Sequence, residues 1–262
     1  MKFGIANISI IPIRKEPSDK SEMISQVLFG ECYKILFENE KWSYIELCYD
    51  KYQGWIDKKN IIPINDDLHN DIMYNIKICN TEISNIDCNE GAYSRQILSP
   101  GSSLPFYISE NKSFTINNDL FFHKGKTSVE IITENKGENI INSALKFINS
   151  PYIWGGRSIF GIDCSGLTQI VFKMNNIFVP RDAYQQVEYG DVVNFIDDIK
   201  PGDIAFFDND NKEIIHVGIL LNRNSIIHAS GKVRIDKFDQ FGIFNEDIKD
   251  YTHKLRVIKR IR

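Results

Sequence analysis

The sequence lacks any apolar run near the roughly 18 residues that a membrane-spanning helix needs. Its N-terminal stretch, MKFGIANISIIPIRKE, is interrupted by Asn7 and Pro12 and has no small-residue cleavage site of the kind that ends an export signal. We therefore expect a cytoplasmic protein without a membrane partner, unless a leader has been removed from the chain.

An excess of charge of one sign is also missing. The 262 residues include 31 Lys and Arg and 35 Asp and Glu, a formal net charge of −4, with no basic stripe and no acidic tail. Clustered positive charge is what binds phosphates, so nucleic acid is not expected as a partner. A 42% apolar content is ample for a buried core in one large domain or two to three small ones.

Cysteine is scarce and scattered. The five cysteines form an odd set without a C-x-x-C spacing, which argues against a disulfide framework, a zinc ribbon and a metal cofactor. A lone cysteine is usually a small buried apolar residue. That interpretation suits Cys32, Cys48, Cys79 and Cys88, whereas Cys164 is surrounded by Asp163, Ser165 and glycines where an apolar pocket would need hydrocarbon.

The pattern along the chain changes once. Residues 1 to about 135 contain short β-branched and aromatic runs between polar turns, with no convincing long helix. A weak similarity between the segments that begin at Ser25 and Ser94 suggests two copies of one small β barrel. From Lys136 apolar residues recur at helical spacing, and strands return after Gly202. The predicted fold class is α+β, with domains at 1–66, 67–135 and 136–262.

The segment GIDCSGLTQIVFKMNNI predicts an amphipathic helix with Cys164 at its N-terminus and Asp163 as its cap. The helix dipole and free backbone N–H groups favour an anion there. We expect this position to lower the pKa of the Cys164 thiol by a unit or more and to make it a nucleophile. The same N–H groups could stabilise an oxyanion.

Two histidines in IIHVGILLNRNSIIHASG supply a candidate base. If residues 222–224 form a three-residue hairpin loop, with Asn224 in left-handed geometry, Gly218 faces His228 and His216 becomes the diagonal neighbour of His228. His216 would then accept the thiol proton and His228 would hold its tautomer. His69, His123 and His253 lack such company and are interpreted as surface or structural residues.

Four motifs in this order resemble the NlpC-type cysteine peptidases of bacterial cell-wall metabolism: Y-I-W-G-G from Tyr152, D-C-S-G from Asp163, H-V-G from His216 and H-A-S-G from His228. The resemblance covers about residues 137–262 and implies a papain-like α+β fold. It implies that Cys164 is the nucleophile, His216 the base and His228 the orienting residue, with Tyr152 near the oxyanion site.

The preceding half looks like two bacterial SH3-like domains, the second divergent. The arrangement is most similar to the γ-D-glutamyl-L-diamino acid endopeptidases (dipeptidyl-peptidase VI), which release L-Ala-D-Glu from murein stem peptides with a free L-Ala amine. The resemblance implies that this amine is held by Asp163 and, through weaker matches, by Glu31 and Tyr52 of the first barrel. Ser165 and Trp154 are further candidates for substrate contact, and for Trp154 core packing explains the residue equally well.

Other interpretations stay open. The chain could be a wall-binding scaffold with a vestigial peptidase domain, or a papain-like amidase or acyltransferase that acts on another acyl group. Cys164, His216 and His228 could also form a zinc site, although no fourth ligand is evident. Neither the diamino acid at the third position, meso-diaminopimelate or L-lysine, nor the oligomeric state follows from the sequence.

Overall fold

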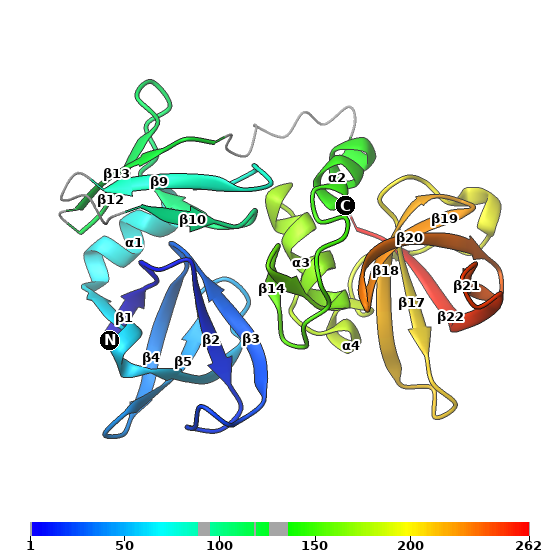
Figure 1. The fold of residues 1–262 in the computed structure, drawn as a ribbon, viewed down its shortest axis with the longest axis horizontal. Coiled ribbons are helices and arrows are strands. Elements are labelled where there is room, and N and C mark those ends of the chain that lie inside the picture. The colour runs from blue at the N-terminus through cyan, green and yellow to red at the C-terminus, as the bar shows by residue number, and fades with distance from the viewer. Residues whose placement is uncertain (1, 89–94, 118, 126–135, 262) are drawn as a thin grey trace. The chain divides into compact units, whose positions relative to one another are not determined.

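The computed structural model describes residues 2–88, 95–117, 119–125 and 136–261 (Figure 1). The chain divides into two compact units, one of Met1–Ser128 with Trp154–Ile159 and one of Val129–Ile153 with Phe160–Arg262. The predicted boundary at 135/136 lies at the edge of residues 126–135, which are outside the described residues, and the three domain boundaries stay predictions. No helix in the described ranges is long and apolar enough to cross a membrane.

The first unit begins with a seven-stranded antiparallel sheet in the order β3-β2-β6-β5-β4-β1-β7. Alternating apolar residues of these strands, among them Ile11, Ile13 and Ile45, fill its core. The elements are β1 (Lys2–Ile5), β2 (Ile10–Arg14), β3 (Met23–Leu28), β4 (Cys32–Glu38), β5 (Trp42–Leu47), β6 (Gln53–Asp57), η1 (Lys58–Asn60) and β7 (Ile62–Ile64).

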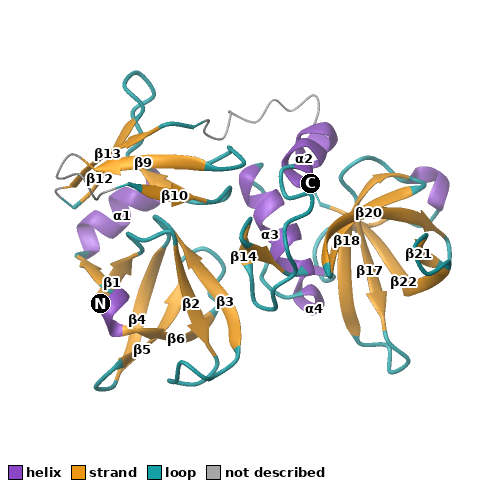
Figure 2. Ribbon diagram, viewed as in Figure 1, coloured by secondary structure: helices purple, strands orange, loops and turns teal. Residues whose placement is uncertain are grey.

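The rest of the first unit differs from the expected second barrel. It starts with a helix that the strand-rich sequence did not predict, α1 (Asp66–Tyr74), capped by Asn65. The strands are β8 (Ile76–Ile78), β9 (Ser84–Cys88), β10 (Gln96–Leu98), β11 (Ser103–Pro105), β12 (Ser113–Ile116) and β13 (Asp119–His123). They form a four-stranded sheet, β10-β9-β13-β12, and a separate pair, β11-β8 (Figure 2).

This second part is not packed as an independent barrel. One apolar cluster joins Ile5 and Phe29 of the first sheet to Leu98, Phe114 and other residues of the second part. A shared core makes the two parts a single folding unit in packing terms. The assignment of the second part as SH3-like stays a prediction.

The second unit has helices first and then a sheet, as predicted. Its elements are α2 (Lys136–Leu145), β15 (Gly161–Ile162), α3 (Cys164–Met174), α4 (Ala183–Gln186), β16 (Asp191–Val192), η3 (Ile196–Asp198), β17 (Ile204–Asp208), β18 (Ile214–Asn222), β19 (Ser225–Ser230), β20 (Lys232–Asp239), β21 (Gly242–Asn245) and β22 (Asp250–Arg260). The short strand β14 (Arg157–Ser158) belongs to the first unit. The sheet order is β16-β22-β17-β18-β19-β20-β21, and β21 also pairs with β22, so β17–β22 close into a barrel.

Helix α3 packs against β18, β19 and α2. Every one of its residues is buried, so the predicted amphipathic character is wrong. Polar residues such as Thr168 and Gln169 tolerate burial because they hydrogen-bond to backbone carbonyls of Cys164 and Val179. A helix enclosed in this way holds its N-terminus, and therefore Cys164, rigidly in place.

Candidate active site

Cys164 is the first residue of α3. The Asp163 carboxylate accepts a hydrogen bond of 2.7 Å from the backbone N–H of Gly166, which confirms Asp163 as the N-cap. Backbone N–H groups of Ser165 and of Val217, on β18, hydrogen-bond to the Cys164 sulfur. The same N–H groups can also stabilise an oxyanion that forms next to the sulfur during a reaction.

The expected lowering of the Cys164 pKa is wrong. Burial and the neighbouring Asp163 carboxylate raise the thiol pKa to about 12, and the N–H groups of Val217 and Ser165 offset only part of that increase. The sequence pattern indicated the helix N-terminus but not how completely the sulfur is enclosed. Cys164 therefore rests as a neutral thiol.

The two predicted histidines lie side by side. His216 Nε2 is 2.8 Å from His228 Nδ1, and His228 Nε2 is 2.9 Å from the Asp236 carboxylate. Since a carboxylate can only accept, His228 carries its proton on Nε2 and accepts at Nδ1 from His216 Nε2–H. In neutral His216 this leaves the lone pair on Nδ1, the nitrogen that can take a proton from the thiol.

The strand register behind this pair was predicted correctly, but for the wrong reason. Gly218 does face His228. The turn, however, pairs Asn222 with Ser225, which leaves only two loop residues, and Asn224 does not have the expected positive φ. A bulge between Leu220 and Asn222 shifts the register by one residue, and this shift keeps the two imidazoles on one face.

Asp236 and Arg234 were not predicted from the sequence. They complete a chain of hydrogen bonds that runs from His216 through His228 to Asp236 and Arg234, which we call the relay. Arg234 faces His228 across β19 and β20, and Asp236 is the diagonal neighbour on the same face. Arg234 donates a 2.8 Å hydrogen bond to Asp236 and also pairs with Asp247. Burial opposes ionisation of Asp236, but hydrogen bonds from His228 and Arg234 outweigh it and lower the pKa of the carboxyl. The alternation in V-R-I-D could have indicated this face.

His253 belongs to the site, and its interpretation as an isolated surface or structural residue is wrong. Its ring, on β22, stacks on His216 with centroids 4.0 Å apart and lies 5.8 Å from His228. The sequence could not show this because β22 reaches the site through closure of the barrel. Burial, with the neighbouring histidines as a second cause, lowers the pKa of His216 well below its ordinary value and that of His253 to about 4.

Asp163, a predicted contact of the substrate amine, is paired with an arginine. Arg181, itself buried, donates hydrogen bonds of 2.6 and 3.0 Å to its two oxygens and one of 2.9 Å to Ser165 Oγ. Asp163 and Ser165 are thus held in a fixed, charge-neutralised cluster beside Cys164. Burial, and to a smaller extent the neighbouring Cys164 and Asp163 side chains, raise the pKa of the Tyr152 phenol to about 12. Tyr152 is therefore a neutral hydrogen-bond donor.

The remaining predicted residues lie in the first unit. Glu31 is buried and paired with Arg157 through contacts of 2.8 and 3.0 Å. Tyr52 packs against the barrel core. Trp154 is 61% exposed and its indole donates a 2.7 Å hydrogen bond to Glu22, so core packing does not explain it.

The geometry does not support the zinc interpretation. Both ring nitrogens of His228 are engaged, by His216 and Asp236, and neither has a lone pair directed to a metal. Within the described ranges, no group of three or more His, Cys, Asp or Glu side chains is arranged to hold a metal ion.

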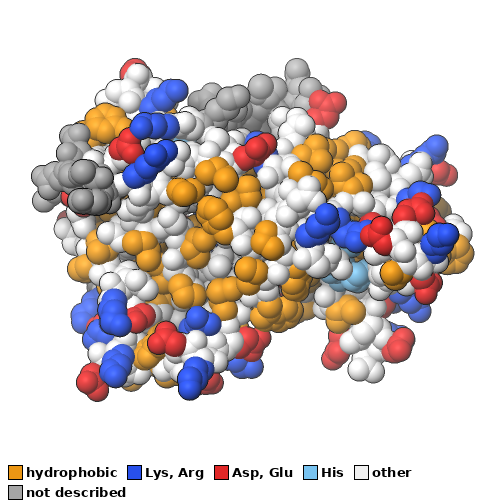
Figure 3. Space-filling model, viewed as in Figure 1, with side chains coloured by type: hydrophobic (Ala, Val, Ile, Leu, Met, Phe, Trp, Pro, Cys, Tyr) orange, Lys and Arg blue, Asp and Glu red, His pale blue; other side chains and the backbone are white. Residues whose placement is uncertain are grey.

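On the face drawn in Figure 3, acidic and basic side chains are intermixed.

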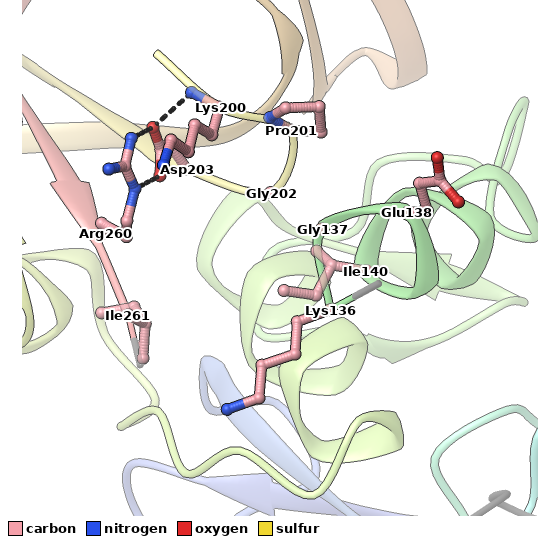
Figure 4. Close-up of a pocket in the computed structure, with 10 residues that line it drawn as sticks. All are labelled: Lys136, Gly137, Glu138, Ile140, Lys200, Pro201, Gly202, Asp203, Arg260 and Ile261. Atoms are coloured by element: carbon pink, nitrogen blue, oxygen red, sulfur yellow. Dashed lines mark hydrogen bonds and ion pairs between the residues drawn. The ribbon is translucent and has the colours of Figure 1, made fainter. Parts of the chain in front are cut away.

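A pocket of about 470 Å³ lies between the start of α2, the residues just before β17 and the C-terminal end of β22. Figure 4 shows that the Arg260 guanidinium and the backbone N–H of Lys200 are both directed to Asp203 there. None of its lining residues belongs to the Cys164 site. This pocket is separate from the candidate chemistry.

Comparison with known proteins agrees with the site. Residues 149–250 match the NlpC/P60 family and residues 13–61 match the bacterial dipeptidyl-peptidase SH3 domain. The chain is 24% identical to dipeptidyl-peptidase 6 of Lysinibacillus sphaericus, over 89% of this chain and 91% of that protein. It is 30% identical to the gamma-D-glutamyl-L-lysine dipeptidyl-peptidase of Bacillus subtilis, over 78% of this chain and 71% of that protein.

The fold is also found in a solved structure. An NlpC/P60 family protein from Bacillus cereus superposes with a TM-score of 0.83 at 19% identity, over 98% of this chain and 99% of the other. Together with the sequence relatives and the Cys164–His216–His228 arrangement, this agreement identifies the chain as a member of the NlpC/P60 family of cysteine peptidases, with a bacterial dipeptidyl-peptidase SH3 domain in its N-terminal half.

Proposed function

We propose that this enzyme hydrolyses the bond between γ-D-Glu and the diamino acid of murein stem peptides with a free N-terminal L-Ala. The products are L-Ala-D-Glu and the remaining peptide, and we place the reaction in cytoplasmic recycling of wall peptides. The observation that carries the proposal is the hydrogen-bonded chain of His216, His228 and Asp236, together with the hydrogen bond from the backbone N–H of Val217, the residue after His216, to the Cys164 sulfur. The names of the two relatives, dipeptidyl-peptidase 6 and gamma-D-glutamyl-L-lysine dipeptidyl-peptidase, support the substrate class.

The acylation step starts from a neutral pair. His216 Nδ1 accepts the Cys164 proton as the sulfur attacks the γ-carbonyl carbon, and the backbone N–H groups at the start of α3 stabilise the oxyanion. The C–N bond then breaks, and the imidazolium of His216 gives its proton to the leaving amine. The Asp236 carboxylate, acting through His228, stabilises the transient positive charge on His216.

Deacylation reverses the roles. Water attacks the thioester carbon while neutral His216 takes a proton from it, the C–S bond breaks, and the proton returns to the sulfur. L-Ala-D-Glu leaves with a new γ-carboxyl group. Every proton is accounted for by His216 and water, so the reaction needs no further reactant.

Asp163 and Glu31 are both paired with arginines, Asp163 with Arg181 and Glu31 with Arg157. We propose that the L-Ala ammonium binds next to the Asp163 carboxylate and that the phenol oxygen of Tyr152 accepts a hydrogen bond from it. Contributions from Glu31 and Tyr52 stay part of this proposal.

The direct test compares L-Ala-γ-D-Glu-L-Lys with its N-acetyl derivative. Acetylation removes the ammonium and its charge-assisted contacts, so we expect kcat/KM to fall by about tenfold or more, on the order of 1.5–3 kcal/mol. Mass spectrometry identifies the bond cleaved. Equal rates on both peptides would contradict recognition of the amine, and cleavage only at other acyl bonds would favour the amidase or acyltransferase alternative.

The scaffold alternative predicts no turnover at all. An intact relay argues against it, because a vestigial site has no need to keep Asp236, Arg234 and His253 packed around the two predicted histidines. Specific cleavage of the free peptide would exclude this alternative.

A further inference from the structure

A second pocket of the catalytic unit, about 580 Å³ in volume, lies next to the relay. His253 forms part of its wall, and the ring of His253 stacks on His216 at 4.0 Å. The other walls include Ile215 and Phe241, apolar side chains that are 53% and 62% exposed. The pocket is therefore open and partly apolar, and only the ring of His253 separates it from the base, His216.

The reaction itself places the leaving residue near this pocket. His216 must deliver its proton to the departing amine, so the α-nitrogen of the leaving residue has to lie at His216. The acyl part of the substrate lies instead over Cys164 and the start of α3, where the oxyanion donors are. The side chain of the leaving residue can extend from His216 along His253 into the pocket.

The wall of the pocket also includes a carboxylate, that of Asp208. The side chain of Asp208, at the end of β17, is only 9% exposed and lines the pocket. Within the described residues its one side-chain ion pair is with Arg256, at 3.7 Å, which is too long for a hydrogen bond. A buried carboxylate that lacks close donors has the capacity to bind a cation that brings its own N–H groups.

We infer that this pocket binds the diamino acid released by the enzyme, with the hydrocarbon part of its side chain against Ile215 and Phe241 and its ω-ammonium on Asp208. The inference rests on the proposed function and extends it to the residue after the cleaved bond. L-lysine and meso-diaminopimelate both carry the ω-ammonium. Norleucine has nearly the same shape as lysine and lacks the charge.

The first experiment needs only the unaltered enzyme. We expect kcat/KM for L-Ala-γ-D-Glu-L-Lys, and for the meso-diaminopimelate peptide, to exceed that for the norleucine peptide by at least about tenfold, the size of one charge-assisted contact. Equal kcat/KM for the lysine and norleucine peptides would overturn the inference. It would leave the proposed function intact, whereas failure to cleave any γ-D-Glu peptide would remove both.

Two substitutions separate charge from shape. Asp208→Asn should remove most of the preference for lysine and change the norleucine rate little, while Phe241→Ala, at an exposed position, should slow both peptides and keep their ratio. The matched control is Asp197→Asn, which removes one charge from a side chain that is 90% exposed. A lysine-to-norleucine ratio that is unchanged in folded Asp208→Asn would overturn the assignment of Asp208, and if that variant does not fold, the ratio in the unaltered enzyme decides.

Discussion

At the scale of single residues, burial acts in opposite directions on the two reacting groups. It raises the Cys164 pKa to about 12 and lowers the His216 pKa well below its ordinary value, so both favour the neutral form. The enzyme thus starts from thiol and imidazole rather than from a thiolate–imidazolium pair. Charge separation takes place only as the sulfur attacks, when Asp236 can stabilise it through His228.

This charge state predicts an unusual acid limb in the pH profile. Only neutral His216 can accept the thiol proton, and its lowered pKa keeps it neutral as the pH falls through 6.5. We expect kcat/KM for the free peptide to decrease only well below pH 6.5. Circular dichroism at each pH verifies that the enzyme is still folded. An acid limb centred at or above pH 6.5, or fast alkylation of Cys164 near pH 6, would instead indicate a resting ion pair.

The sequence predicted the main reacting residues because each lies in a short local motif. Cys164 and its cap are adjacent, and His216 and His228 share one hairpin. Asp236 and His253 were not predicted, since their proximity depends on how β20 and β22 pair in the closed barrel. The pairing of Asp163 with Arg181 was also missed, because 18 residues separate the two and neither lies in a motif with the other.

At the scale of elements, the hairpin of β18 and β19 shows how a correct register can come from a different turn. A two-residue turn alone would place His216 and His228 on opposite faces. The bulge near Leu221 compensates for the missing loop residue. Apolar alternation indicates which face a strand buries, but nothing in LLNRNS distinguishes a longer loop from a shorter loop with a bulge.

The other elements also divide into those that the sequence predicted and those that it did not. The start of the helix at Cys164 was predicted to the residue, because a cap and a helical apolar pattern coincide there, whereas the helix ends at Met174, before the Ile177 that ends the predicted segment. Helix α1 and strand β21 were missed, since their apolar residues are few and their stability comes from tertiary packing. The divergent second part of the first unit was predicted least well, because its strands complete a core shared with the first sheet.

At the scale of the whole molecule, the short segment Trp154–Ile159 packs with the first unit although the residues on both sides belong to the second. Arg157 anchors it through buried contacts with Glu31 and with the Gln26 carbonyl, the latter 2.6 Å long. Gly155 has a φ of +76°, and a Cβ there would lie 2.3 Å from the Met23 carbonyl oxygen. The segment is thus held tightly within the first unit.

This anchor predicts a large stability effect. Arg157→Gln leaves the Glu31 charge buried and should lower the free energy of unfolding by about 3 kcal/mol or more. Lys2→Gln, which removes an exposed ion pair with Glu38, should cost no more than about 1 kcal/mol. Urea unfolding measures both, and similar values for the two variants would contradict the structural role. Glu31→Gln shares this destabilisation, so loss of activity in that variant alone cannot demonstrate amine binding.

The central prediction is that Cys164 is the nucleophile that cleaves the γ-D-Glu bond. The decisive measurement is the turnover of L-Ala-γ-D-Glu-L-Lys by the parent enzyme and by Cys164→Ser, followed by mass spectrometry of the products. We expect L-Ala-D-Glu and L-lysine from the parent and a loss of at least about a thousandfold in the folded variant, because a hydroxyl attacks far less readily than the thiol at this site. Turnover retained in Cys164→Ser, or a parent that releases other fragments, would contradict the proposed mechanism and substrate.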